Sequence, residues 1–371
     1  MKKIIQIGIL ILNVFYVFIK LFPTQNKIVM LSRQSNSPSI EFKMLQEGIL
    51  HKDKSVKVVL LCKMLGNGLE KKLEYLLHIF KQMYHIATAK VVILDSYCIA
   101  VSVLKQKKSL KVIQMWHSMG TMKKFGYTAL DTKEGSRHEL ADVMKMHRNY
   151  DYIFASSDAY KDHLAKGFNY SVDKIITMPL PRVDLLKSTS YSEKKRKEIY
   201  SKYPDLNDKS VILYCPTFRK DEKRFSEALN KLIVALEGKE YNLVIKLHPL
   251  SKVTLPKGIN RIDDFSSFEM LFVADYVISD YSCIIYEAAL RNIPLFFYNF
   301  DMEIYEENRG LAIDYYNELP GVISKNPKEI VKAIEKKQYD MTELKNFANK
   351  YIAPVNNATE DIVKFIFKIK D

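Results

Sequence analysis

Short apolar runs alternate with longer amphipathic stretches along most of this chain. In the first half, the stretches 40–50 and 68–84 carry apolar residues at helical spacing. The short apolar runs between such stretches read as buried strands. These runs are 27–32, 56–62, 89–95, 111–116 and 150–156. Strand–helix alternation of this kind predicts a mainly parallel sheet that helices cover on both faces.

The alternation is interrupted once and then resumes. Residues 191–208 are mostly polar, and we expect them to form a helix and turn at a domain junction. Further strands are predicted at 211–218, 241–249, 276–282 and 293–299. The fold class is therefore α/β, with two Rossmann-like domains and a ligand in the cleft at the carboxyl ends of their strands. The predicted boundaries are 24–185 for the first domain, 186–208 for a linker, 209–345 for the second domain and 346–371 for a helical tail.

The first 23 residues form a separate apolar segment, in which Lys2 and Lys3 precede a run from Ile4 to Ile19. The small-residue cleavage site of a signal peptide does not follow it. The run is also shorter than the roughly 20 apolar residues of a spanning helix. We expect a helix that lies in the membrane surface with its lysines near the lipid headgroups. A first helix packed on the protein is the alternative.

Lysine and arginine number 57 against 43 acidic residues, which gives a formal charge of +14. This surplus indicates an anionic partner: nucleic acid, an anionic membrane or a phosphorylated substrate. A solvated lysine-rich surface would have the same charge. The four cysteines are far apart, so the sequence does not predict a zinc site. Cys98 and Cys215 lie in apolar runs and fit reduced core residues of a cytosolic protein.

Two predicted strands of the second half end in side chains that suit phosphate. Thr217 and Arg219 are two residues apart, so they share one face of an extended chain. Arginine can grip phosphate through two parallel hydrogen bonds. Lys246 and His248 repeat this spacing before Pro249, which ends the next strand. The structural alternatives are a core role for His248 and solvated side chains for Arg219 and Lys246.

A third strand runs into Ser279, Asp280 and Ser282 before a predicted helix. Free backbone N–H groups and the helix dipole favour an anion at such a point. Ser279 and Ser282 could add hydroxyl donors there. Asp280 would repel phosphate, so we expect it to cap the helix or to orient a neighbouring donor; a cap is also the alternative for Ser279. Taken together, the three strand ends suit a diphosphate.

His117 ends a predicted strand of the first half. Ser118 and Gly120 follow it, so the backbone can turn sharply and approach a ligand closely. An imidazole with a pKa of about 6.5 is neutral at cell pH and can accept a proton from a hydroxyl. His117 is therefore our candidate for a catalytic base.

The residues around His117 suggest that the two halves of the chain bind different substrates. We expect Trp116 to pack in the core, and we place Gly120, Lys123 and Lys124 on the side of an anionic acceptor. The second half would hold a nucleotide diphosphate, and the first would hold an acceptor hydroxyl beside a base. The chain contains no P-loop sequence, no G-x-G-x-x-G and no D-x-D. We therefore expect no cofactor and no metal ion, with basic side chains and a helix dipole stabilising the diphosphate.

Several motifs recur together in a fixed order. They are WHSMGTMKKFG, PRVD, CPTFR, KLHP, SDYSCIIYEAALRNIPLFFY, FDMEIY, RGLAIDYY and LPG. The set resembles the CDP-glycerol glycerophosphotransferase family, the bacterial teichoic acid primases and polymerases. The resemblance extends over roughly residues 27–350, and the ordered set is more specific than any single motif.

The resemblance implies a GT-B fold and transfer of glycerol phosphate or ribitol phosphate from a CDP-alditol donor, with release of CMP. The implied acceptor is a lipid-linked saccharide or polymer of the undecaprenyl diphosphate type. The implied location is the cytoplasmic side of a bacterial membrane, with its anionic surface as a partner and no nucleic acid. A glycosyltransferase that uses a nucleotide sugar and a basic, membrane-bound scaffold without activity are the alternatives.

Carried over by motif, the resemblance also implies roles for individual residues. His117 matches the proposed base, and His248 is a second catalytic candidate, at the donor phosphates. Donor-binding candidates, to which we add Lys246, are Thr217, Arg219, Ser279, Asp280, Ser282, Asp301, Tyr305 and Arg309. Gly310 and Asp314 match the same cleft signature, and Pro181, Arg182 and Asp184 match a hinge motif for which we favour a structural ion pair. Ser118 and Cys283 depart from the family pattern, which commonly has glycine and serine there.

Overall fold

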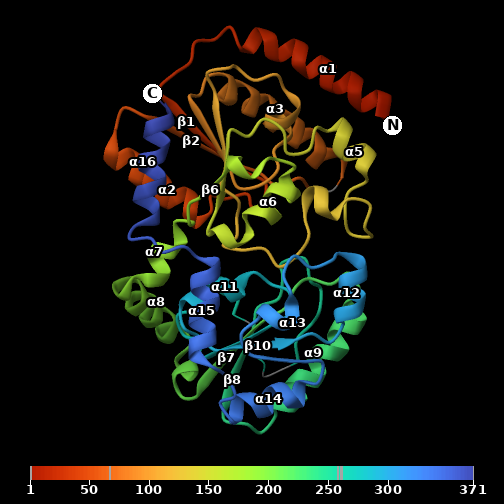
Figure 1. The fold of residues 1–371 in the computed structure, drawn as a ribbon, viewed down its shortest axis with the longest axis vertical. Helices are drawn as coiled ribbons and strands as arrows, with labels where there is room; N and C mark the ends of the chain where they lie inside the picture. The colour runs from red at the N-terminus through yellow and green to blue at the C-terminus, as the bar shows by residue number, and fades with distance from the viewer. Residues whose placement is uncertain (1, 67, 257–258, 260–261, 371) are drawn as a thin grey trace. The chain divides into compact units, whose positions relative to one another are not determined.

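The computed structural model describes residues 2–66, 68–256, 259 and 262–370. The chain forms two compact units, each built around one parallel sheet (Figure 1). The first unit comprises Met1–Ser118, Lys124–Asp184 and Val355–Asp371, and the second comprises Met119–Lys123 and Leu185–Pro354. The prediction of two parallel α/β domains is confirmed.

The sheet of the first unit has six strands in the order β2-β1-β3-β4-β5-β6. They are β1 (Lys27–Ser32), β2 (Lys57–Cys62), β3 (Val91–Leu94), β4 (Lys111–Gln114), β5 (Tyr152–Ala155) and β6 (Ile175–Thr177). In the register of the central strands, Ile28 pairs with Val58 on one side and with Val91 on the other. Every residue of β1 is buried, as a strand covered on both faces requires.

The first unit has helices before, between and after these strands. They are α1 (Lys2–Ile19), α2 (Ile40–Lys52), α3 (Leu69–Ala87), α4 (Ile99–Val103), α5 (His138–Val143), α6 (Lys161–Phe168), the start of α7 (Arg182–Lys187) and α16 (Ala358–Lys370). Helix α16 packs beside α2, and its Phe365 contacts the rings of Tyr152 and Phe154 on β5, with centroids 5.0 and 5.6 Å apart. The last helix of the chain therefore completes the first unit.

The sheet of the second unit has five strands in the order β11-β10-β9-β7-β8. They are β7 (Ser210–Cys215), β8 (Tyr241–Ile245), β9 (Tyr276–Ser279), β10 (Leu295–Tyr298) and β11 (Val322–Ser324). The helices are α8 (Thr189–Lys202), α9 (Glu222–Leu236), α10 (Ser267–Met270), α11 (Ile284–Leu290), α12 (Met302–Asn308), α13 (Tyr315–Glu318), α14 (Pro327–Glu335) and α15 (Met341–Tyr351). One core cluster joins Leu232 of α9 and Ile330 of α14 to Ile212 of β7 and Ile278 of β9.

The structure divides the chain differently from the predicted boundaries at three places. Residues 186–208 are helical for most of their length and belong to the second unit, where Ile199 and Leu206 are buried. The helical tail is shared, because α15 belongs to the second unit and α16 to the first. Residues 119–123 belong to the second unit, although the chain on both sides of them belongs to the first.

Helix α1 lies along the first unit beside α3, where Phe15 contacts Phe80 with ring centroids 6.2 Å apart. Asn13 donates to the carbonyl of Val103 at 3.0 Å, and the Tyr16 hydroxyl donates to Gln106 at 2.6 Å. By length and composition, α1 is the one helix of the described residues that could cross a membrane. The segment therefore has a face packed on the protein and a face that stays exposed.

Candidate functional site

The carboxyl ends of β8, β7 and β9 are neighbours in the second unit. Strand β7 pairs with both other strands, so that Tyr214 lies opposite Ile245 and Cys215 lies opposite Ser279. Parallel strands end at the same edge of a sheet, where loops bring side chains together. The three strand ends whose side chains were predicted to suit phosphate are therefore adjacent in the sheet.

Arg219 is the centre of a buried ion cluster just beyond these strand ends. Its Nε and Nη2 atoms donate to the two carboxylate oxygens of Asp301 at 2.6 and 3.1 Å. Nη2 also donates to Asp280 at 2.9 Å, and Nη1 donates to the carbonyl of Thr217 at 2.7 Å. Burial opposes the charge of the guanidinium, but the carboxylates outweigh it and raise the pKa of Arg219. The donors of Arg219 meet protein acceptors, so the expected two-pronged grip on a phosphate is not the arrangement in the structure.

Two tyrosine rings enclose this ion cluster. Tyr281 and Tyr305 stack with ring centroids 4.0 Å apart, and the guanidinium carbon of Arg219 lies 5.1 and 4.8 Å from those centroids. Aromatic faces attract cations, and they also keep water away from the ion pairs. We call Arg219, Asp280, Asp301, Tyr281 and Tyr305 the arginine cluster. It fixes the loops after β7, β9 and β10 relative to one another.

Asp280 and Thr217 connect the arginine cluster to the end of β7. The Asp280 carboxylate accepts hydrogen bonds from the Thr217 backbone N–H at 2.9 and 3.1 Å. This agrees with the expectation that Asp280 orients a neighbouring donor; Cys283, not Asp280, precedes α11 as its N-cap. Among the described residues, the buried Thr217 Oγ1 has no hydrogen-bond partner. An orphaned hydroxyl costs about 1–3 kcal/mol, so a phosphate oxygen that accepts from it would remove this cost.

Two of the predicted donor-site residues, Ser279 and Lys246, form hydrogen bonds within the protein. Ser279 is fully buried, and its hydroxyl donates to the carbonyl of Cys215 at 3.1 Å, which ties β9 to β7. The Lys246 ammonium donates to the backbone carbonyls of Ile262 and Phe265, the second at 2.6 Å. Ser279 and Lys246 therefore hold the segments that follow β7 and β8, and ligand contacts of either residue stay a prediction.

His248 and Ser282 lie at the exits of β8 and β9. His248 is exposed, and its Nδ1 accepts from the Leu250 backbone N–H at 3.2 Å. The neutral ring therefore carries its proton on Nε2, where it can donate to an anion. Burial and the nearby charge of Lys123 lower the pKa of His248. Ser282 is half-buried before α11, a helix of 7 residues.

The cleft signature of the sequence lies around α12 and α13. Asp301 and Tyr305 belong to the arginine cluster, and Arg309 ends α12. Gly310 has a φ of 77°, in the left-handed region that suits glycine. Asp314 accepts from the Asn317 side chain at 2.8 Å at the start of α13. The residues from 309 to 314 therefore shape this loop.

His117 lies beyond β4 in the first unit, where its side chain is exposed. Its Nδ1 is 3.0 Å from the carbonyl oxygen of Asp95, which follows β3. Desolvation lowers the pKa of His117, and the charge of Arg182 acts in the same direction; the Asp95 hydrogen bond and the charge of Glu41 oppose them. The ring is therefore neutral at pH 7.

Trp116 sets the direction of His117 in two ways. Its φ of 67° lies in the left-handed region, an uncommon conformation for a bulky residue that costs of order 1–3 kcal/mol. Its ring lies 4.2 Å from that of His117 and 4.6 Å from that of Phe125, centroid to centroid. The predicted packing role of Trp116 thus includes a strained turn that presents His117.

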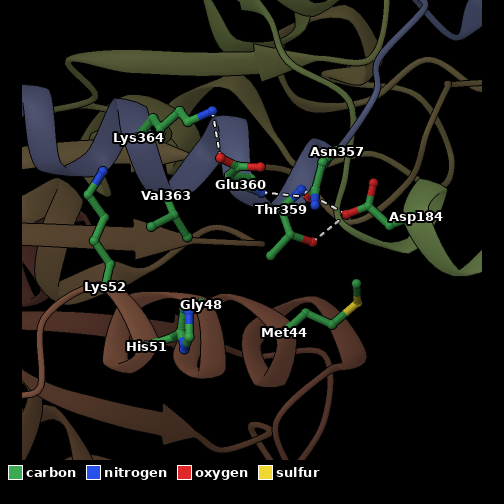
Figure 2. Close-up of a pocket in the computed structure, with 10 residues that line it drawn as sticks. All are labelled: Met44, Gly48, His51, Lys52, Asp184, Asn357, Thr359, Glu360, Val363 and Lys364. Carbon is green, nitrogen blue, oxygen red and sulfur yellow. Dashed lines mark hydrogen bonds and ion pairs between the residues drawn. The ribbon is translucent and has the colours of Figure 1, made fainter.

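The hinge motif has structural partners in the first unit. Arg182 forms an ion pair with Glu41 of α2, and the Asp184 carboxylate accepts from the backbone N–H groups of Ala358 and Thr359 at 2.7 and 2.9 Å. Figure 2 shows Asp184 beside α16, at the edge of a pocket of about 750 Å³ that α2 and α16 line. The expected ion pair is present at Arg182, whereas Asp184 caps a helix.

Gly120, Lys123 and Lys124 were expected on the acceptor side, and the first two belong to the segment 119–123, which has its contacts in the second unit. Gly120 packs so closely on the ring of Tyr286 that any Cβ would overlap it. The backbone of Lys123 forms an antiparallel bridge with Leu311. Gly120 therefore serves close packing, and Lys123 belongs to the second unit by its contacts. Lys124 is exposed and belongs to the first unit.

Comparisons with known proteins place this site in a family. The family described as CDP-glycerol:poly(glycerophosphate) glycerophosphotransferase matches residues 14–368. The chain belongs to this family. The family and its teichoic acid relatives are phosphotransferases that use a CDP-alditol, so the protein is a phosphotransferase of this class.

Individual relatives are similar along most of their length. The teichoic acid ribitol-phosphate primase of Bacillus spizizenii is 30% identical over 93% of this chain and 92% of its own. The teichoic acid glycerol-phosphate primase of Bacillus subtilis is 29% identical over 78% of this chain and 76% of its own. A variant of the wall teichoic acid polymerase TagF soaked with CDPG superposes with a TM-score of 0.75 at 19% identity, over 100% of this chain and 96% of the other. The predicted GT-B fold is confirmed.

Sequence reasoning missed the residues that hold the functional groups in place. Asp95 acts through its backbone carbonyl, which has no sequence signal. Glu41 lies 141 positions from Arg182, and Asp301 lies 82 positions from Arg219. Tyr281 stood inside a quoted motif, where its position between two candidate serines was the one available signal.

Proposed function

We propose that this protein transfers glycerol phosphate or ribitol phosphate from a CDP-alditol to a hydroxyl of a lipid-linked acceptor in teichoic acid or capsule synthesis. The family supports the donor class, and the orphaned Thr217 hydroxyl and the Nε2–H of His248 support a site for its phosphates. The acceptor would be a saccharide or polymer on an undecaprenyl-type diphosphate. The proposal needs no cofactor.

His117 is the base of the proposed reaction. The Asp95 carbonyl can only accept, so Nδ1 of the neutral ring carries the proton and Nε2 offers a lone pair. The acceptor hydroxyl gives its proton to Nε2 while its oxygen bonds to the phosphorus that bears the alditol. The bond from that phosphorus to the bridging oxygen breaks, and CMP leaves with the electron pair. This neutral, exposed and oriented imidazole is the observation that carries the proposal.

The second unit would stabilise charge on the leaving CMP. Thr217 and His248 can donate hydrogen bonds, and Ser282 adds a hydroxyl at the exit of β9. The arginine cluster keeps these groups in place before the donor arrives, so little reorganisation is needed during the reaction. Positioning and electrostatics supply most of the rate in phosphoryl transfer.

An apolar surface on the first unit supports peripheral attachment to the cytoplasmic side of the membrane. Helices α1 and α3 lie side by side (Figure 1). The outer face of α1 exposes Leu10 and Phe18, each at 64%, and α3 exposes Leu69 and Leu77 at 86% and 65%. On α3, the exposed Leu69, Leu73, Leu76 and Phe80 recur at helical spacing. Two such faces side by side, with lysines at the start of α1, suit an anionic membrane interface.

The decisive experiment offers the purified protein a panel of CDP-glycerol, CDP-ribitol and nucleotide sugars with a lipid-linked acceptor. The released nucleotide and the length of the product are then measured. CMP release that depends on both a CDP-alditol and the acceptor is the expected result. Release of a nucleoside diphosphate from a sugar donor, without turnover of any CDP-alditol, would contradict the proposal.

A further inference from the structure

The arginine cluster does not itself offer positive charge to the donor site. Arg219 contacts two carboxylates, Asp280 and Asp301, so these three groups together have a net negative charge. A diphosphate would be repelled by such a site unless further positive charge is present. The source of that charge must therefore be sought around the cluster.

Lys123 supplies a positive charge at this point of the second unit. Its ammonium lies 5.7 Å from the ring centroid of Tyr305, on which the guanidinium of Arg219 also rests. It interacts electrostatically with Cys283, Asp280 and Arg309, and its charge also acts on His248. Lys123 is therefore surrounded by the exits of β8 and β9 and by the end of α12.

The backbone around Lys123 is firmly held. Lys123 pairs with Leu311, the Thr121 hydroxyl donates to the Lys123 carbonyl at 2.9 Å, and the Met122 carbonyl accepts from Ala312 N–H at 3.0 Å. Met119 and Met122 are fully buried. The segment thus behaves as part of the donor unit, and the ammonium is pre-positioned.

The Lys123 ammonium has no hydrogen-bond or ion-pair partner among the described residues, although the side chain is half-buried. Burial lowers the pKa of Lys123, and the charges of Arg219 and Arg309 add to this effect, while Cys283 and Asp280 oppose it. A half-buried ammonium that forms no hydrogen bond or ion pair is costly, and an anionic ligand would reduce that cost.

We propose that Lys123 binds the diphosphate of the CDP-alditol donor. This inference rests on the proposed function, and it moves Lys123 from the acceptor to the donor. Lys123 follows His117 by only six positions, so one short loop supplies both the base and a cation for the leaving group. The two residues that depart from the family pattern are close to this feature: Ser118 belongs to the same loop, and Cys283 interacts with the Lys123 ammonium.

The test measures binding of CDP-glycerol, CDP-ribitol and cytidine by calorimetry to the wild type, Lys123→Met and Lys123→Arg. Lys223→Met, an exposed lysine of α9, is the matched control. We expect Lys123→Met to weaken binding of its CDP-alditol about 10- to 100-fold, the value of hydrogen bonds to charged groups, with cytidine binding unchanged. Lys123→Arg should recover part of the affinity, and Lys223→Met should bind like the wild type.

The kinetic arm separates this inference from the proposed function. Lys123→Met should raise KM for the donor and leave KM for the acceptor unchanged. A raised acceptor KM with an unchanged donor affinity would overturn the role of Lys123 while CMP release upheld the function. Equal losses for cytidine and the CDP-alditol would assign Lys123 a structural role and also overturn it. A wild type that neither binds nor turns over any CDP-alditol would refute both.

Discussion

The Nδ1 atom of His117 lies 3.0 Å from the backbone oxygen of Asp95, and this one contact decides which nitrogen can act as a base. A backbone oxygen is present whatever the side chain at position 95, so the orientation does not depend on a second catalytic residue. We therefore expect His117→Ala to lower kcat by about 10²- to 10⁴-fold, the usual contribution of general base catalysis. Steady-state CMP release measures this. Donor affinity should stay within twofold, and His138→Ala, an exposed histidine of α5, should keep full activity.

The pH dependence of kcat should report the protonation of His117. Only the neutral ring can accept the proton, so activity should fall as the pH decreases through the pKa. Desolvation and Arg182 lower this pKa below its ordinary value, so the midpoint should lie below pH 6.5. Arg182→Gln should move the midpoint to a higher pH. A midpoint above 7 in the wild type would exclude His117 as the titrating base.

Asp301→Ala should destabilise the second unit strongly. It removes two charge-assisted hydrogen bonds from the buried Arg219 and leaves Asp280 as its one carboxylate partner in the arginine cluster. Hydrogen bonds to charged groups typically contribute about 1.5–3 kcal/mol each to the free energy of unfolding. Glu303 is the matched control, because it is an exposed acid in the first turn of α12, the helix that Asp301 precedes, and it pairs with Lys325. Glu303→Ala should cost no more than about 1 kcal/mol. Urea unfolding compares the two variants, and equal losses would show that the arginine cluster contributes little.

Gly120→Ala should destabilise the protein through a clash with the ring of Tyr286. Overpacking of this kind typically costs about 1–3 kcal/mol. Gly8→Ala adds the same methyl group on α1, where nothing lies within 4 Å, and should be neutral or slightly stabilising. Thermal unfolding distinguishes them. Unchanged stability of Gly120→Ala would mean that the segment 119–123 moves easily.

Charge on the outer face of α3 should release the protein from membranes. Leu77→Glu places a carboxylate on a side chain that is 65% exposed, at a surface expected to contact lipid. Sedimentation with vesicles containing anionic lipid should show a several-fold loss of bound protein. Val234→Glu is the control, since Val234 is 62% exposed on α9 of the other unit. Similar binding of both variants to vesicles would rule out α3 as a contact.

Regular elements were predictable wherever the apolar pattern was long or complete. The stretch 27–32 is β1 at the same bounds, and the predicted helical tail 346–371 contains α16 (Ala358–Lys370). The strands β6 and β11 were missed because each has only 3 residues and sits at the edge of its sheet. Three residues are too few to show a period.

The candidate site was predictable in its location and less so in the roles of its residues. Thr217 and Arg219 do share the exit of β7, as their spacing indicated. The spacing could not reveal that Asp301 neutralises Arg219, because that pairing joins distant segments. The same limit applied to Lys123, because its short segment 119–123 belongs to the second unit while the chain on both sides of that segment belongs to the first.

The placement of residues 119–123 has a consequence for exchanging donor specificity between relatives. The chain passes between its two units after positions 118, 123, 184 and 354, so no single cut separates them. A chimaera that replaces only 185–354 would join a foreign donor half to a native Lys123, with Gly120 facing a foreign residue at position 286. A chimaera that exchanges 119–123 together with 185–354 would keep Gly120 and Lys123 with the residues that they contact. The two segments that would have to be exchanged together to transfer donor specificity, 119–123 and 185–354, are thus separated in the sequence.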